Sequence, residues 1–326
     1  WRPDGTVQYA ENPPKKYQDI LPINFESEDW ENLWDELKSV FEFWIEQGVK
    51  VFRVDNPHTK SMEFWRWCIL NIKAKHPEVI FLAEAFTRPK RKYFLAKGGF
   101  THGYTYFTWR NTAAELQAYV EELTQSGAKE YFWPNFWPNT PDILHADLQS
   151  GNRATFIGRY VLAATLSSNV GIYGPAYELL DHEPYPGKEE NNHSEKYQLK
   201  AWDLDKPGNI RAEIARVNAL RNHHEAFQRT FNVHFIPCNN THIIAYLKQN
   251  FDKTDRFIIV VNMDWEHKQV GTLDLSPEHL GLAHEGSLRL VDQFAHAPKE
   301  YLWKGTNPYL ELDPRICPAH IFQIVD

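Results

Sequence analysis

The sequence has few cysteines, fewer basic than acidic residues and no long apolar run. Its 326 residues include three cysteines, too few and too widely spaced for a disulfide framework or a cysteine metal motif. The formal net charge is −8, which disfavours a nucleic-acid partner because such binding depends on Lys and Arg neutralising phosphates. No run of about 18 apolar residues occurs, so we expect no membrane partner.

Motifs for bound metals and nucleotides are also missing. The sequence has no Gly-rich phosphate loop and no metal-ligand spacing, so we expect no cofactor and no metal ion. The few cysteines favour a cytoplasmic location. The first 23 residues are polar and Pro-rich, as in a loop, and no Met begins the chain. We therefore expect a piece of a longer protein.

Aromatic residues, in contrast, are abundant. They make up 14% of the sequence, with 12 Trp, 15 Tyr and 20 Phe. Such rings either fill a core or line a site for sugars or peptides, and composition leaves both interpretations open.

Helical and strand patterns alternate along most of the chain. Helical spacing predicts helices at residues 27–47, 61–75, 90–97, 111–126, 152–168 and 210–227, and apolar runs predict strands at 49–55, 79–84, 103–107, 130–133 and 170–173. Strands that alternate with helices form a parallel sheet, so the fold class is α/β over residues 1–229. Short alternating runs separated by turn residues then predict a C-terminal β-sandwich domain over residues 230–326.

Three carboxylates follow the predicted strands. Asp55 and Glu84 end two neighbouring strands, and Asp142 lies in the loop after a later one. Parallel α/β folds place active sites at these strand ends. A retaining glycosidase needs a nucleophilic carboxylate and an acid/base carboxyl about 5–5.5 Å apart, which neighbouring strands can supply. Each residue alone could be a helix N-cap, but three in this order favour a glycoside site. Arg53, on the same strand face as Asp55, would keep that carboxylate ionised.

These residues lie in motifs that resemble those of the α-amylase superfamily. Residues 52–55 (FRVD) resemble its nucleophile motif, 82–85 (LAEA) its acid/base motif, and 139–142 (NTPD) the motif of a third, sugar-binding Asp. That last motif commonly has His before the Asp, where this sequence has Pro141. The longer strings 11–19, 53–60, 139–144 and 171–179 are similar to the α-1,4-glucan:maltose-1-phosphate maltosyltransferase branch.

The resemblance implies a retaining transfer. Asp55 would attack the anomeric carbon of α-maltose-1-phosphate, Glu84 would act as acid and then base, and Asp142 would bind sugar hydroxyls. The maltosyl unit would pass to an α-1,4-glucan acceptor. By resemblance, Asn12, Lys15, Tyr17 and Asn56 would bind the phosphate, although Lys15 and Lys16 by themselves read as a solvated charge pair of a loop. Arg53 is expected to bind substrate too, and Lys60 either lines the sugar cleft or is a surface lysine.

The resemblance also implies an incomplete barrel. The superfamily has an eight-stranded (β/α)8 TIM barrel, and only one predicted helix precedes the strand that ends in Asp55. We therefore expect a partial TIM barrel, strands 4 to 8, that exposes sheet edges and forms a homodimer. The isolated chain is expected to be weakly active or inactive. An α-amylase-type glycoside hydrolase and a non-catalytic glucan-binding fragment are the alternative functions.

Overall fold

The computed structural model describes residues 2–12, 15–195, 198–275, 277 and 286–325, which divide into two compact units. Unit 1 comprises Trp1–Tyr104 and Glu130–Trp133, and unit 2 comprises Thr105–Lys129 and Pro134–Asp326. This division lies away from residue 229, where the sequence predicts a boundary, and that boundary stays a prediction. Among the described residues, no helix has the length and apolar character needed to cross a bilayer.

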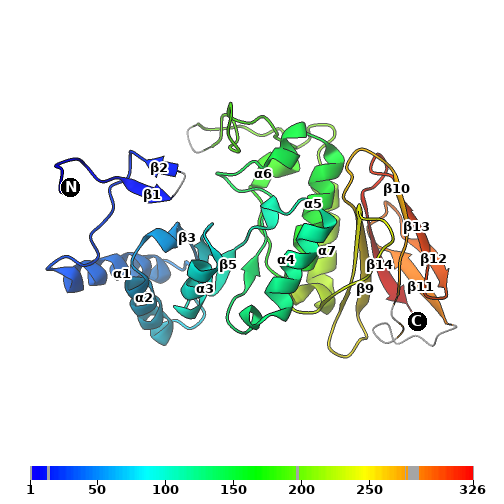
Figure 1. The fold of residues 1–326 in the computed structure, drawn as a ribbon, viewed down its shortest axis with the longest axis horizontal. Helices are drawn as coiled ribbons and strands as arrows, with labels where there is room; N and C mark the ends of the chain where they lie inside the picture. The colour runs from blue at the N-terminus through cyan, green and yellow to red at the C-terminus, as the bar shows by residue number, and fades with distance from the viewer. Residues whose placement is uncertain (1, 13–14, 196–197, 276, 278–285, 326) are drawn as a thin grey trace. The chain divides into compact units, whose positions relative to one another are not determined.

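Unit 1 opens with a hairpin and continues as alternating strands and helices (Figure 1). The elements are β1 (Ala10–Asn12), β2 (Lys15–Tyr17), α1 (Trp30–Glu46), β3 (Val51–Asp55), the 3-10 turn η1 (Pro57–Thr59), α2 (Met62–Lys75), β4 (Ile80–Glu84), α3 (Pro89–Lys97) and β5 (His102–Tyr104). Strands β1 and β2 pair antiparallel, where the sequence indicates only a loop. Pro13 and Pro14 of that segment lie outside the described residues.

Strands β3, β4 and β5 pair in parallel, as the alternation predicts. Phe81 and Ala83 of β4 are buried in an apolar core with residues of α2, so the other face of the strand presents Leu82 and Glu84. Ser61 starts α2 as its N-cap, because its side chain accepts a hydrogen bond from the Phe64 N–H. Local propensity and burial thus place the carboxylates on one face at the strand ends.

Unit 2 begins with helices and 3-10 turns. They are η2 (Phe107–Trp109), α4 (Ala113–Gln125), η4 (Ala146–Ser150), α5 (Arg153–Leu166), α6 (Gly174–Glu178), α7 (Arg211–His223) and η5 (Glu225–Gln228). The predicted strand at 130–133 is wrong, since a 3-10 turn, η3 (Gly127–Glu130), ends there and the short strand β6 is Pro134–Asn135. The predicted strand at 170–173 is reduced to one bridge between Val170 and Phe136.

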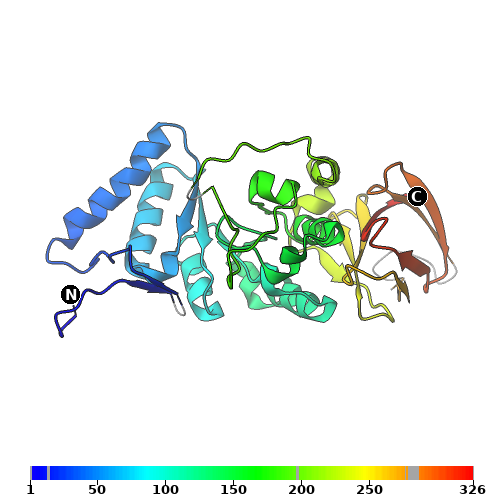
Figure 2. The ribbon, with the colours of Figure 1, turned by 90° about the horizontal axis from the view of Figure 1, so that it is seen from above.

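The C-terminal part of unit 2 is an antiparallel β domain. Its strands are β7 (Val233–Phe235), β8 (Ile243–Gln249), β9 (Arg256–Asn262), β10 (Gln269–Thr272), β11 (Ser287–Asp292), β12 (Lys299–Lys304), β13 (Tyr309–Leu312) and β14 (Ala319–Val325). Six of them form one sheet in the order β12-β11-β14-β9-β8-β7, while β10 pairs with β13. Helices α4 and α5 lie against β8 and β9 (Figures 1 and 2). Both faces of these central strands are therefore buried.

Candidate active site

Asp55 and Glu84 end two adjacent parallel strands of unit 1 and lie opposite each other. The pairing of β3 with β4 sets Asp55 in register with Glu84. Neighbouring strands are about 4.8 Å apart, close to the carboxyl spacing of about 5–5.5 Å in retaining glycosidases. The Asp55 side chain is 69% exposed, whereas that of Glu84 is 6% exposed. One carboxylate is thus open to an incoming molecule, and the other is shielded from water.

Arg53 connects the two carboxylates, but it is closer to Glu84. Its Nη2 lies 2.7 Å from Glu84 Oε1, whereas its Nη1 is 4.0 Å from Asp55 Oδ2. Burial would lower the pKa of Arg53, but Glu84 and Asp55 outweigh it and raise the pKa. Arg53 also hydrogen-bonds the buried side chain of Tyr104, whose pKa burial raises. A charged guanidinium is therefore held at the strand ends, and its main partner is Glu84 rather than Asp55.

Asn56 makes the turn that follows β3. Its φ of 45° is in the left-handed region, which Asn adopts more readily than most residues. This turn brings the Asn56 N–H to 3.4 Å from Glu84 Oε2. Each oxygen of Glu84 thus faces a donor, Arg53 on one side and the Asn56 backbone on the other. The carboxyl group is held in one orientation.

The N-terminal hairpin brings Asn12 to this turn. Asn12 Nδ2 donates to Asn56 Oδ1 at 3.3 Å, and Asn12 Oδ1 lies 3.1 Å from His58 Nε2. Lys15 is opposite Asn12 in the hairpin register, and Tyr17 is opposite Ala10. The structure therefore brings together Asn12 and Asn56 of the predicted phosphate group, with Lys15 and Tyr17 on the partner strand of the same hairpin.

Lys60 lies at the end of the same turn. Its Nζ donates to Thr59 Oγ1 at 2.8 Å. Burial lowers the pKa of Lys60, and the negative charge of Asp55 opposes that effect. The lysine is thus a half-buried cation within the field of the exposed carboxylate.

Asp142 belongs to unit 2. It lies in a tight turn in which Thr140 bridges Ile143, and its N–H donates to Thr140 Oγ1 at 3.2 Å. The neighbouring Asn139 is buried and accepts a hydrogen bond from the Tyr173 N–H at 2.8 Å. The turn is therefore rigidly built, and the role of Asp142 beside Asp55 and Glu84 stays a prediction.

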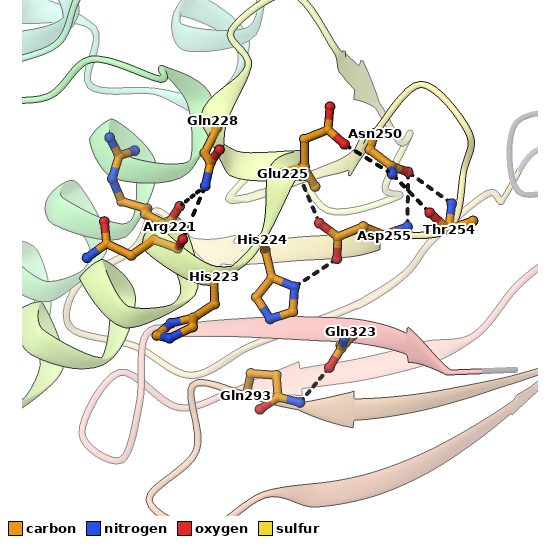
Figure 3. Close-up of polar contacts among 12 residues, drawn as sticks. Arg221, His223, His224, Glu225, Gln228, Asn250, Thr254, Asp255, Gln293 and Gln323 are labelled. Atoms are coloured by element: carbon orange, nitrogen blue, oxygen red, sulfur yellow. Dashed lines mark hydrogen bonds and ion pairs between the residues drawn. The ribbon is translucent and has the colours of Figure 1, made fainter.

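The histidines at the end of α7 make structural contacts. Figure 3 shows His224 turned toward Asp255, with His224 Nδ1 2.8 Å from Asp255 Oδ1, while Asp255 Oδ2 accepts the Ala226 N–H. His223 Nδ1 lies 2.7 Å from the Ala219 carbonyl oxygen in the last turn of the helix. Across the part of the chain that the structure describes, no group of three or more His, Cys, Asp or Glu residues has the arrangement of a metal site.

Tyr104 and His58 make contacts at the site that no sequence motif predicts. Tyr104 carries no signal beyond an aromatic ring, yet it hydrogen-bonds Arg53. His58 follows the nucleophile motif, and it lies 46 residues along the chain from the Asn12 that it contacts. Only the fold reveals such a contact.

Comparisons with known proteins find similar sequences for this chain. A family model described as "GLGE, C-terminal" matches residues 235–324. A protein of Chlorobaculum tepidum named alpha-1,4-glucan:maltose-1-phosphate maltosyltransferase is 56% identical over 330 residues, covering 99% of this chain and 49% of that protein. A protein of the same name from Methylacidiphilum infernorum is 55% identical, covering 99% of this chain and 48% of that protein. The chain spans about half the length of these curated relatives.

Solved structures support the same fold. An α-amylase of Geobacillus thermoleovorans, solved with acarbose, matches 92% of this chain and 65% of its own with a TM-score of 0.67 at 17% identity. Amy13B of Eubacterium rectale matches 99% and 69% with a TM-score of 0.69 at 13% identity. At these identities the likeness concerns the fold alone. The parallel α/β region corresponds to part of the amylase barrel and is followed by an antiparallel β domain, which confirms the predicted fold class.

Proposed function

Because the chain is homologous to the α-1,4-glucan:maltose-1-phosphate maltosyltransferases over about half of their length, we propose that it carries the reacting residues of a retaining maltosyl transfer. The observation that carries the proposal is the register of Asp55 with Glu84, one exposed and one buried, at the ends of adjacent parallel strands. The donor would be α-maltose-1-phosphate, and the acceptor an α-1,4-glucan.

The first step would form a covalent intermediate on Asp55. An oxygen of the Asp55 carboxylate bonds to the anomeric carbon as the bond from that carbon to the phosphate oxygen breaks. The proton on Glu84 goes to the departing phosphate. The exposure of Asp55 leaves room for the sugar, and the guanidinium of Arg53 lies beside both carboxyl groups.

The second step would release the sugar to the acceptor. Glu84, now a carboxylate, takes the proton of the acceptor 4-hydroxyl, whose oxygen bonds to the anomeric carbon as the bond to Asp55 breaks. Two inversions leave the configuration retained. Glu84 is buried, and Arg53 and the Asn56 N–H lie beside its oxygens, so the carboxyl group stays in place through both steps.

Phosphate release from α-maltose-1-phosphate, with a maltooligosaccharide acceptor present, tests this function. We would assay the 326-residue chain and also a chimera in which it replaces the matching 330 residues of the Chlorobaculum tepidum relative. We expect the chimera to release phosphate and extend the acceptor, and the isolated chain to be slower or inactive.

Asp55→Asn and Glu84→Gln chimeras are expected to lose the activity. Release of reducing ends from starch without any phosphorylated donor would instead indicate a hydrolase. A folded chimera that shows neither reaction would contradict the proposal and leave a glucan-binding fragment as the function.

A further inference from the structure

His58 is a buried histidine with one partner and no part in the two steps above. It lies in η1, between the strand that ends in Asp55 and α2, and is 4% exposed. Its Nε2 is 3.1 Å from Asn12 Oδ1, while its Nδ1 is buried without a hydrogen-bond partner among the described residues. Burying a nitrogen without a hydrogen-bond partner costs folding free energy, so we expect His58 to serve a purpose other than stability.

The turn itself is firmly anchored. The Trp65 side chain donates through Nε1 to the Pro57 carbonyl at 3.0 Å, and Arg91 Nη1 lies 3.4 Å from the His58 carbonyl oxygen. Burial, followed by the positive charges of Arg91 and Lys60, lowers the pKa of His58 to about 4, against an opposing effect of Asp55. The imidazole is therefore neutral near neutral pH and carries a single N–H.

The position of that N–H follows from the surroundings of the two ring nitrogens. Nδ1 is buried without a partner among the described residues, so a proton there would be an unsatisfied donor. The proton therefore lies on Nε2, which donates to Asn12 Oδ1. This arrangement fixes which way the Asn12 amide faces.

The orientation of the Asn12 amide also sets that of the Asn56 amide. With its oxygen engaged, Asn12 uses Nδ2 to donate to Asn56 Oδ1 at 3.3 Å. The Asn56 oxygen is thereby engaged as well, so among the described residues one side-chain N–H of Asn12 and both side-chain N–H groups of Asn56 are left to donate. Reversed amides would present oxygens, which repel an anion.

We propose that His58 is a positioning residue for the donor phosphate, which it serves by turning the Asn12 and Asn56 amides so that their N–H groups face the anion. This inference rests on the proposed function, since it assigns the phosphate of α-maltose-1-phosphate to these two amides. His58 itself would touch neither the sugar nor the phosphate.

The test compares two substitutions of His58 in the active chimera, with inorganic phosphate and maltose as separate titrants in calorimetry. His58→Phe keeps the ring and removes the donor, so we expect phosphate to bind about tenfold or more weakly while maltose binds within about twofold of the parent. His58→Gln sets an amide nitrogen near the place of Nε2, and we expect it to recover phosphate binding to within about threefold.

The matched control is His102→Phe. His102 is also a histidine of unit 1, with a pKa lowered by burial and Lys73 and an Nδ1 that is buried without a partner among the described residues. It begins β5, and its ring lies 6.0 Å from that of Trp133. We expect this variant to bind phosphate as the parent does. Thermal unfolding followed by circular dichroism verifies that each variant is folded, and His58→Asn, whose shorter amide ends near the place of Nδ1, replaces His58→Phe if the latter does not fold.

The outcomes separate this inference from the proposed function. If the parent transfers maltosyl units and His58→Phe binds phosphate equally well, the positioning role is wrong and the function stands. An equal loss of phosphate and maltose binding would also overturn the positioning role, because it would show general disruption. A parent that binds no phosphate and releases none from the donor would overturn both.

Discussion

Lys248 shows how a single residue can conflict with its surroundings. It lies in β8 with 0% exposure, and its Nζ donates to the Arg229 carbonyl oxygen. Burial, together with the charge of Arg221, holds the pKa of Lys248 well below its usual value. Among the residues that the structure describes, the ammonium has no carboxylate partner, so protonation is unfavourable in the folded chain.

Replacing Lys248 with Met should flatten the pH dependence of stability. Since the folded state holds the proton less tightly than the unfolded chain, the free energy of unfolding rises with pH up to the normal lysine pKa of about 10.4. We expect urea denaturation at about pH 7 and about pH 9.5 to show a smaller stability increase in Lys248→Met than in the parent. Lys304→Met, at an exposed site, is the control. An unchanged slope in Lys248→Met would contradict the expectation.

Single residues also show what the sequence can and cannot predict. The strand pattern before Asp55 and Glu84 predicts two carboxylates at neighbouring strand ends, because alternation and burial are local properties. Arg53 is predicted to support Asp55, yet its shorter contact is to Glu84 on the next strand. The preference of Arg53 for Glu84 depends on side-chain rotamers and on the hydrogen bond from Arg53 to Tyr104, and the sequence alone predicts neither.

At the scale of elements, α5 contains a glycine that its helical pattern does not explain. Gly158 lies in the middle of the helix, where Gly costs about 0.5–1 kcal/mol relative to Ala. A Cβ at this position would overlap Cζ3 of Trp265, in the β domain of the same unit. The missing side chain makes room for an indole ring.

Gly158→Ala is therefore expected to destabilise the chain despite its better helix propensity. Overpacking against Trp265 should lower the free energy of unfolding by about 1–3 kcal/mol, more than the helix gains. In a Trp265→Ala background the same change should become stabilising by about 0.5–1 kcal/mol. A double-mutant cycle by urea denaturation measures the coupling, and independent, additive effects would show that the contact is unimportant.

Both incorrectly predicted elements depend on contacts between residues that are far apart in the sequence. The aromatic run at residues 131–133 has strand propensity, yet Phe132 is buried by rings and cations: it packs 5.5 Å from Tyr93, beneath Lys92, and against Gly103. The Phe132 ring therefore packs in the core, while the Trp133 carbonyl oxygen accepts a hydrogen bond from the Gly103 N–H of β5 at 3.0 Å, just before β6 begins. The polar, Pro-rich sequence of the N-terminal hairpin predicts a loop, because the contacts of Asn12 are with Asn56 and His58, which lie far away in the sequence.

At the scale of the molecule, the proposed catalytic residues fall in different compact units. Asp55 and Glu84 belong to unit 1, and Asp142 belongs to unit 2. The sequence assigns all three to one reaction through motif resemblance, which depends on neither distance nor orientation. The fold class is confirmed, whereas the joint role of the three residues stays a prediction that kinetics can test.

Asp142→Asn separates sugar chemistry from phosphate recognition. If Asp142 binds sugar hydroxyls at the reacting position, its loss should lower kcat for maltosyl transfer in the chimera by about 100-fold or more, as when a group that stabilises the transition state is removed. Affinity for inorganic phosphate should be unchanged, because Asn12, Asn56 and His58 are intact in unit 1. Asp205→Asn, at a fully exposed carboxylate of unit 2, is the matched control. Undiminished transfer by Asp142→Asn would exclude this Asp from the reaction, whereas loss of phosphate binding along with transfer would mean that its role extends beyond the sugar.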